Sequence, residues 1–287
     1  MSAMSSSAEL VEPTYGHRKA TNLFLWCGAL IVGLNIALAV FGEVVSPASI
    51  DDQDLLGLLA PPSSEHLLGT DPLGRDVLSR TILGTRYTMS AALLSVSLAA
   101  LLGVPFGAMA GFFGGRIDAV ISTFVDVLLT IPLVILAIAI ASVLGSGLFG
   151  LVMATSISFA PRLARLIRGR VIEIRDAEYI LASRALGMTN ARIIFRHVLP
   201  NTFTVATIEI TLLAGQAVLI ATALGFLGLG VQPPIPEWGT MLGEGREYME
   251  IAPHLVVAPG MAITILVLGF NILGDGLRDL VDPASNR

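Results

Sequence analysis

Side chains that could do chemistry are sparse in this 287-residue chain, and their spacing excludes several activities. The single lysine, Lys19, follows no glycine-rich loop, so the motif that cradles nucleotide phosphates is missing. The four histidines are scattered, and no HExxH helix is present to hold a metal. Ser146 stands between two glycines, which marks a turn, and no histidine is expected nearby to activate it. We expect no catalytic residue, no metal and no bound cofactor on this chain.

Two carboxylates, Asp126 and Glu209, fall inside long apolar segments. Such acids are costly in a membrane, so each is a functional candidate by default. Both lie only about two or three helical turns from the predicted cytoplasmic boundary, where arginines can reach them. We favour a structural role, in which each acid reaches an arginine or water at that boundary. A proton-coupled secondary transporter that uses both acids is the alternative.

The elements that position these residues are membrane helices. Hydrophobic residues make up 54% of the chain and charged residues only 14%, with a mean hydropathy of +0.79. Several uncharged runs reach the 18 to 20 or so residues that cross a bilayer. The net charge of −5 makes nucleic acid an unsuitable partner. The single cysteine, Cys27, excludes an internal disulfide.

We predict an all-α polytopic membrane protein with six transmembrane helices. Gly145–Ser146–Gly147 splits one long apolar run into a helical hairpin. The predicted spans are 20–45, 87–115, about 119–142, about 148–167, about 200–226 and about 253–277. The five later spans form a core over 87–277. The remaining segments are a tail at 1–19, external segments at 46–86 and 228–251, an internal loop at 168–200 and a tail at 278–287.

The positive charges set the predicted orientation. With both termini in the cytoplasm, thirteen of the seventeen lysines and arginines lie on the cytoplasmic side. Short cationic loops favour that side, and the inverted arrangement would oppose this bias. We therefore predict a multi-pass protein in contact with membrane lipid, with the N- and C-termini cytoplasmic.

The internal loop reads as two short helices separated by a glycine. Asp176 is placed to cap the first helix, Gly187 to end it in the left-handed conformation, and Thr189 or Asn190 to cap the second. On the first helix a single face carries Tyr179, Ala182 and Leu186. This predicts a helix that lies flat beneath the membrane. Amphipathicity alone does not separate it from a plain connection between two spans.

This loop resembles the EAA loop of ABC importer permeases. Leu181–Ala182–Ser183 stands at the Glu-Ala-Ala triplet, and Gly187 and Pro200 stand at the later positions of the pattern. Leu181, Ser183 and His197 depart from it, replacing Glu, Ala and Ile. The Glu178–Tyr179 start, the Arg184–Gly187 core and the Arg196–Asn201 ending are similar to the dipeptide and oligopeptide branch.

The external segments resemble the C-type permeases of dipeptide, oligopeptide, nickel and glutathione importers. The matching stretches are His66–Arg80, Leu224–Gly239 and Asn271–Asp279. The signature residues are Gly69, Thr70, Asp71, Gly74, Arg75, Asp76, Pro233, Pro234 and Trp238.

From residue chemistry alone, the first signature predicts a capped turn that leads into an interfacial helix. Arg75 and Arg80 would then be free to meet headgroups or nearby acids. The second signature predicts a proline-rich loop, favoured over a gate, with Trp238 anchored at the membrane interface.

The resemblance implies a type I ABC importer permease fold in the bacterial cytoplasmic membrane. It implies four kinds of partner: a homologous B-type permease, two cytoplasmic ATPase subunits that bind ATP and Mg, an external substrate-binding protein, and a peptide substrate. The chain itself would not be an enzyme. Nickel chelate or glutathione is the alternative substrate. The residues implied to couple to the ATPases are Asp176, Glu178, Tyr179, Ala182, Ser183, Ala185, Leu186, Gly187 and Pro200.

Overall fold

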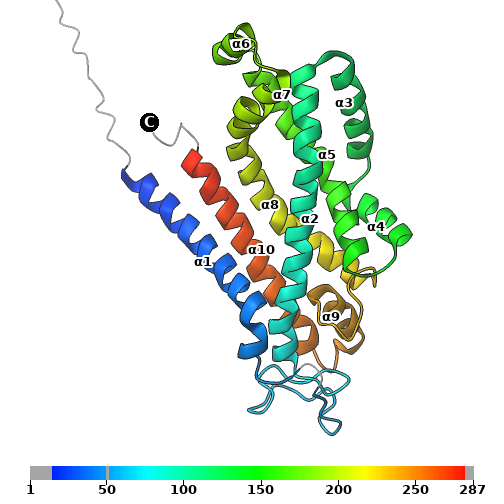
Figure 1. Ribbon diagram of the computed structural model, residues 1–287. Helices are drawn as coiled ribbons and strands as arrows, with labels where there is room; N and C mark the ends of the chain where they lie inside the picture. Colours follow the sequence, from blue (N-terminus) through cyan, green and yellow to red (C-terminus); the bar gives the residue numbers. More distant parts are fainter. Residues whose placement is uncertain (1–14, 50–51, 282–287) are drawn as a thin grey trace, which may run out of the picture.

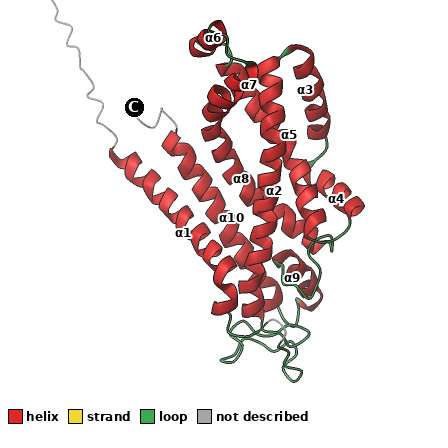
Figure 2. Cartoon of the chain, in the orientation of Figure 1, coloured by secondary structure: helices red, strands yellow, loops and turns green. Residues whose placement is uncertain are grey.

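The computed structural model describes residues 15–49 and 52–281, and it describes side chains for 23–49 and 52–280. Apart from one isolated bridge between Thr70 and Asp76, regular structure in these ranges is helical, which confirms the all-α prediction (Figure 2). The helices are α1 (Tyr15–Val45), α2 (Val77–Phe113), α3 (Gly115–Thr130), α4 (Leu133–Leu144), α5 (Leu148–Ile174), α6 (Glu178–Ala185), α7 (Asn190–Ile193), α8 (Leu199–Phe226), α9 (Trp238–Gly245) and α10 (His254–Val281).

The long helices run side by side and the short ones lie at the two ends (Figure 1). Helices α1 and α10 pack along one edge, α2 and α5 pack together, and α3 and α4 lie at the opposite edge. Helix α6 stands at one end, which we call the α6 end. Helix α9 and the segment before α2 lie at the other, which we call the α9 end. Helices suit a bilayer because they satisfy their own backbone hydrogen bonds.

Four helical stretches are long and apolar enough to cross a membrane. They are 23–45 in α1, α2, the continuous stretch 190–226, and 254–280 in α10. The pair α3 and α4 counts as a fifth only as a broken span, because the two helices meet at 94°. Helix α5 has 27 residues but carries four arginines in its second half, so composition alone does not mark it as a span. A sixth span, through α5, stays a prediction.

The span predicted over about 119–142 is not one continuous helix but the bent pair α3 and α4. Helix α3 ends at Thr130, and Ile131 adopts an extended conformation with φ −84° and ψ 127°. Proline disfavours the helical conformation in the residue before it, so Pro132 ends α3 at this point. Helix α4 then starts in a new direction.

Other boundaries also differ from the sequence prediction. Helix α1 begins at Tyr15, and α2 begins at Val77, so the predicted interfacial helix is the first part of α2 itself. The internal loop predicted over 168–200 is mostly helical. Helix α5 continues to Ile174 and the stretch 190–226 is one continuous helical run, which leaves 175–189, with α6, as the connection.

Helices α2 and α5 approach each other across a row of glycines. Gly103, Gly107 and Gly111 recur at four-residue spacing on one face of α2. A Cβ atom at any of them would overlap a backbone carbonyl oxygen of α5. Small residues at this spacing let helix backbones approach closely in membranes. The rest of the main core lies around Phe159, Leu213 and Trp238, all nearly fully buried.

Candidate functional site

Helix α6 is anchored to the molecule by one buried face. Ile180 is fully buried in a cluster with Ile193 and Val198, and Ser183 is buried beside it. The Arg184 guanidinium lies over the Phe112 ring of α2 at 5.0 Å. A cation over an aromatic face adds about 0.5–1 kcal/mol at exposed sites. The helix is therefore held against α2 and the π turn at Ile194–Val198 before α8, although it projects at the α6 end (Figure 1).

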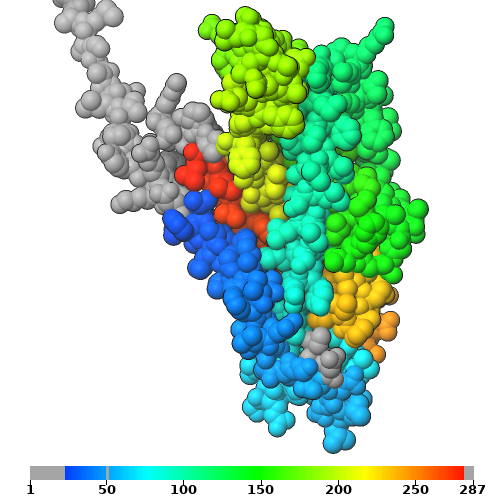
Figure 3. Space-filling view, in the orientation of Figure 1, coloured from blue at the N-terminus to red at the C-terminus, as the bar shows by residue number. Residues whose placement is uncertain are grey.

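The opposite face of α6 is exposed and largely apolar. Tyr179 is 43% exposed, Leu186 is 85% exposed, and Ala182 between them is also exposed. In the space-filling view, the yellow-green segment that holds α6 and α7 stands out at this end (Figure 3). Apolar residues in a raised, anchored position are typical of a protein contact. The face predicted from the sequence spacing is the face that the fold leaves open.

The two helix-boundary predictions in this segment have different outcomes. Gly187 has φ +81°, as predicted for a glycine that ends a helix, and Thr189 accepts from the Arg192 N–H as the cap of α7. Asp176 does not cap α6. The N-cap is Ala177, which offers no side-chain acceptor, and the Asp176 carboxylate instead lies 3.3 Å from Arg175 Nε.

Pro200 lies in the first turn of α8, as predicted. A π turn over Ile194–Val198 precedes it, and the Leu199 N–H donates to the Ile194 carbonyl five residues back. Proline has no N–H, and its ring crowds the carbonyl four residues earlier. The wider π turn relieves this crowding, so α7 and α8 join without a break.

At the α9 end, the first sequence signature forms a buried charged cluster. Asp71 lies 2.6 Å from Arg75 Nε and 3.4 Å from Arg80 Nε, and Arg80 reaches Glu244 of α9 at 3.6 Å. Asp71, Arg75 and Arg80 are each no more than 5% exposed. The arginines predicted to meet headgroups or acids thus meet acids, and Arg80 also donates to the Pro234 carbonyl at 3.4 Å. They tie the segment before α2 to α9.

Asp76 completes this signature as the N-cap of α2. One carboxylate oxygen accepts from the Ser79 N–H and hydroxyl, each at 2.7 Å, and the other lies 3.0 Å from His66 Nδ1. Gly69 and Gly74 have φ values of +77° and +75°, which glycine adopts without strain. The buried Thr70 carbonyl lies 3.2 Å from His254 Nε2 of α10. The predicted capped turn is therefore present.

Glu237 caps α9 and is fully buried. Its carboxylate accepts from the N–H groups of Gly239 and Thr240 at 2.9 Å, and from the Thr88 hydroxyl of α2 at 3.2 Å. Burial raises the pKa of Glu237. The neighbouring Trp238 is 1% exposed and donates to the Thr81 carbonyl at 2.9 Å, so its predicted place at the membrane interface is wrong.

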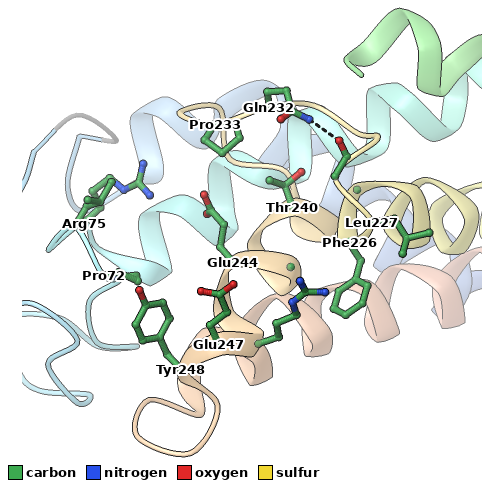
Figure 4. A pocket seen from close by; sticks show the side chains of 15 residues that line it. Pro72, Arg75, Phe226, Leu227, Gln232, Pro233, Thr240, Glu244, Glu247 and Tyr248 are labelled. Carbon is green, nitrogen blue, oxygen red and sulfur yellow. Dashed lines mark hydrogen bonds between the residues drawn. The ribbon is translucent and has the colours of Figure 1, made fainter. Parts of the chain in front are cut away.

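A pocket of about 540 Å³ opens between the first signature and α9 (Figure 4). Arg75, Glu244 and Glu247 face it with Tyr248, and Pro233 lies on its rim (Figure 4). The Arg246 guanidinium stacks 5.4 Å from the Phe226 ring at the end of α8. Both charge signs and aromatic rings are therefore available at this surface.

The two intramembrane acids both pair with arginines of α5. Glu209 Oε1 lies 2.7 Å from Arg162 Nε, although this N–H is not aligned for a hydrogen bond, so charge attraction holds the pair. Asp126 pairs with Arg165. An arginine partner is one of the two structural arrangements, arginine or water, expected from the sequence. Among the described residues, no group of three or more His, Cys, Asp or Glu is placed to hold a metal.

Sequence reasoning missed several residues that the fold brings together. Glu237 caps α9 and Glu244 meets Arg80, but a lone glutamate beside a tryptophan or between glycines gives no signal of either contact. Gly103, Gly107 and Gly111 did carry a signal, because small residues four apart in an apolar run indicate close helix packing.

Known proteins match most of the chain. Residues 103–287 match the family described as binding-protein-dependent transport system inner membrane component. The chain is 42% identical to the dipeptide transport system permease protein DppC of Alkalihalophilus pseudofirmus, over 89% of this chain and 84% of that protein. It is 41% identical to the glutathione transport system permease protein GsiD of Pectobacterium atrosepticum, over 88% and 85%.

The fold matches solved structures as well. An inward-facing structure of the MetNI methionine ABC transporter aligns with a TM-score of 0.58 and 21% identity, over 71% of this chain and 98% of that one. A second crystal form aligns with a TM-score of 0.56 and 22% identity, over 72% and 97%. At this identity the likeness concerns the fold alone.

Proposed function

The chain belongs to the family of binding-protein-dependent transport system inner membrane components, the membrane-spanning permease subunits of ABC importers. We propose that its cargo is a peptide. We also propose that α6 couples transport of this cargo to ATP hydrolysis on other subunits. The chain is not itself an enzyme. The observation that carries the coupling proposal is the exposed apolar face of α6 on a firmly anchored helix.

The anchoring of α6 supports a mechanical role. Its buried face joins the cluster that holds α7 and the start of α8, and Arg184 ties it to α2. Packed elements switch between discrete arrangements, so a partner that moves α6 would also move the spans to which it is packed. A flexible loop would absorb the same motion.

We assign the partners by this geometry and by the family. Two ATPase subunits that bind ATP and Mg would meet the α6 end in the cytoplasm, and a B-type permease would pair with this chain. A substrate-binding protein would deliver cargo at the α9 end. The excess of arginine on α5 and the segment after it supports a cytoplasmic α6 end with both termini on that side.

The named cargoes of the relatives support a peptide. One relative is named for dipeptide transport and another for glutathione transport. Both cargoes carry carboxylate and ammonium groups on a small peptide backbone. The proton-coupled alternative has less support, because each acid on which it relies is engaged by an arginine in the structure.

The proposal is tested by affinity purification of the detergent-solubilised chain from its native membrane. Two ATPase chains and a second permease should co-purify, and ATP hydrolysis should rise when a binding protein loaded with dipeptide is added. An empty binding protein serves as the control. Purification of the chain alone, with uptake driven by a proton gradient after reconstitution, would overturn the proposal.

A further inference from the structure

Several polar side chains lie on the outer surface of helices that belong in the membrane. We call them the polar track: Asp126 of α3, Arg162 and Arg165 of α5, and Glu209 and Gln216 of α8. Arg162, Glu209 and Gln216 lie about three helical turns or more from either end of their helices. They lie within the spans predicted from the sequence, where an uncompensated charge is costly.

Arg162 is the centre of this track. Its Nε lies 2.7 Å from Glu209 Oε1, and its Nη1 donates to Gln216 Oε1 at 3.1 Å, so one side chain bridges two turns of α8. The Arg162 side chain is nonetheless 46% exposed. Arg165 lies about one turn after Arg162 on α5 and pairs with Asp126 of α3. The side chains of Asp126 and Arg165 are 60% and 58% exposed. The pairing thus leaves Asp126, Arg162 and Arg165 open to their surroundings, whereas the Glu209 side chain is only 15% exposed.

Other faces of the same molecule expose apolar side chains, which suit contact with lipid tails. On α1, the exposed residues include Leu30 and Leu34, at 63% and 56% exposure. On α10, Met261, Ile265 and Leu268 form an exposed apolar row. Lipid tails suit these two helices and not the polar track. The polar track is therefore better suited to water or polar groups than to lipid.

We propose, on the basis of the proposed function, that the polar track lines the water-filled path of the peptide and that Arg162 and Glu209 contact its charged ends. A small peptide carries a carboxylate and an ammonium group, which are the charge complements of this pair. The peptide carboxylate can take the place of Glu209 at Arg162 while the ammonium takes the place of Arg162 at Glu209. Each charge then keeps a partner as the cargo passes.

Accessibility to water tests the track without relying on transport. In the reconstituted complex, with Cys27→Ser as background, Gln216→Cys should react with a charged, membrane-impermeant thiol reagent. Leu34→Cys on the apolar face of α1 is the matched control and should react about tenfold more slowly or less. Saturating dipeptide delivered by the binding protein should slow the reaction at position 216. Equal and negligible reaction rates at positions 216 and 34 would show that position 216 faces lipid or a dry contact with the second permease. This result would overturn the proposal.

A second variant tests the role of Arg162 in contacting cargo. Arg162→Gln should lower peptide uptake per ATP hydrolysed by about tenfold, because the cargo loses roughly one charge-assisted hydrogen bond. ATP hydrolysis stimulated by the loaded binding protein should persist. Arg86→Gln, which removes an exposed pair with Glu43, is the control. A parallel fall in uptake and hydrolysis, or no change in either, would contradict cargo contact.

These outcomes are distinct from failure of the proposed function. If the chain is not part of a peptide importer, the wild-type complex will show no ATP hydrolysis stimulated by loaded binding protein. If only the polar track is misassigned, stimulation will be normal and position 216 will stay unreactive.

Discussion

At the scale of single residues, burial decides which charges matter for stability. The Asp71 carboxylate serves two buried arginines and also accepts from the Leu73 and Arg75 N–H groups. Glu43 meets Arg86 at a similar distance, but the two side chains are 73% and 54% exposed. Exposed pairs contribute about 0–1 kcal/mol, whereas removal of one partner from a buried pair costs about 3–5 kcal/mol.

Asp71→Asn should therefore destabilise the protein by about 3–5 kcal/mol, because it leaves the buried Arg75 charge without its acid and leaves Arg80 only the longer 3.6 Å contact to Glu244. Glu43→Gln should change stability by less than about 1 kcal/mol. Chemical denaturation of both variants in detergent measures the difference. Equal effects of the two substitutions would show that the Asp71 cluster is not the stabilising contact that its burial implies.

Glu237 gives a pH dependence with a definite sign. Burial raises the pKa of Glu237, so the native protein holds this proton more tightly than the unfolded chain does. Its contribution to stability is complete below the ordinary value of 4.5 and is lost as pH rises through the higher native value. Glu237→Gln, which cannot ionise, should lack this loss.

The melting temperature of wild type relative to Glu237→Gln should thus decline from about pH 4.5 upward. Thermal unfolding in detergent over a pH series measures it. A relative melting temperature that rises over the same range would mean that the hydrogen bonds from Gly239 and Thr240 stabilise the ionised carboxylate more than burial disfavours it.

The conformation or capping role of a residue could be predicted where it depends only on neighbouring residues in the sequence. The left-handed Gly187 and the capping Thr189 follow from residue type and spacing alone. Asp176 failed as a cap because Ala177, one residue later, is the last extended residue before α6. The partner of Arg80 could not be predicted, because Glu244 is far away in sequence and only the fold brings the two together.

At the scale of elements, glycine spacing sets how closely two helices pack. Gly107→Ala should destabilise the α2–α5 contact by about 1–3 kcal/mol, since the new Cβ would overlap the Ala164 carbonyl. Gly169→Ala in α5 is the matched control, because nothing lies within 4 Å of its Cβ position. It should be neutral or stabilise by up to about 1 kcal/mol.

Thermal unfolding of both variants in the same detergent tests this packing. Similar melting temperatures for Gly107→Ala and Gly169→Ala would contradict the close approach of α2 and α5. The expected difference comes from the packing of α2 against α5, because neither glycine has a positive φ that would strain a substituted residue.

Hydropathy predicted which segments form helices, but it did not predict the direction in which each helix runs. Long apolar runs predicted the helices correctly, and the Gly145–Ser146–Gly147 turn separates α4 from α5 as expected. The 94° bend before α4 was missed because hydropathy does not change there. Pro132 was the available sign, since a proline restricts the residue before it.

At the scale of the whole molecule, two specialised ends are joined by long helices. One end presents the exposed face of α6, and the other holds the buried charged cluster and the pocket beside α9 (Figures 1 and 4). Helix α2 extends from the cluster around Arg80 to the ring of Phe112 beneath Arg184. A single continuous helix thus links both ends. The distribution of lysine and arginine, together with the family resemblance, predicted the two ends, but only the fold shows which helix connects them.

A charge at Leu186 shows most directly whether α6 receives the motion of partner ATPases. In the reconstituted complex, Leu186→Asp should abolish both peptide uptake and the ATP hydrolysis stimulated by loaded binding protein, while membrane insertion stays normal. Leu56→Asp, at a fully exposed leucine of the α9 end, is the matched control and should keep hydrolysis near the wild-type rate. Wild-type uptake by Leu186→Asp would contradict the account.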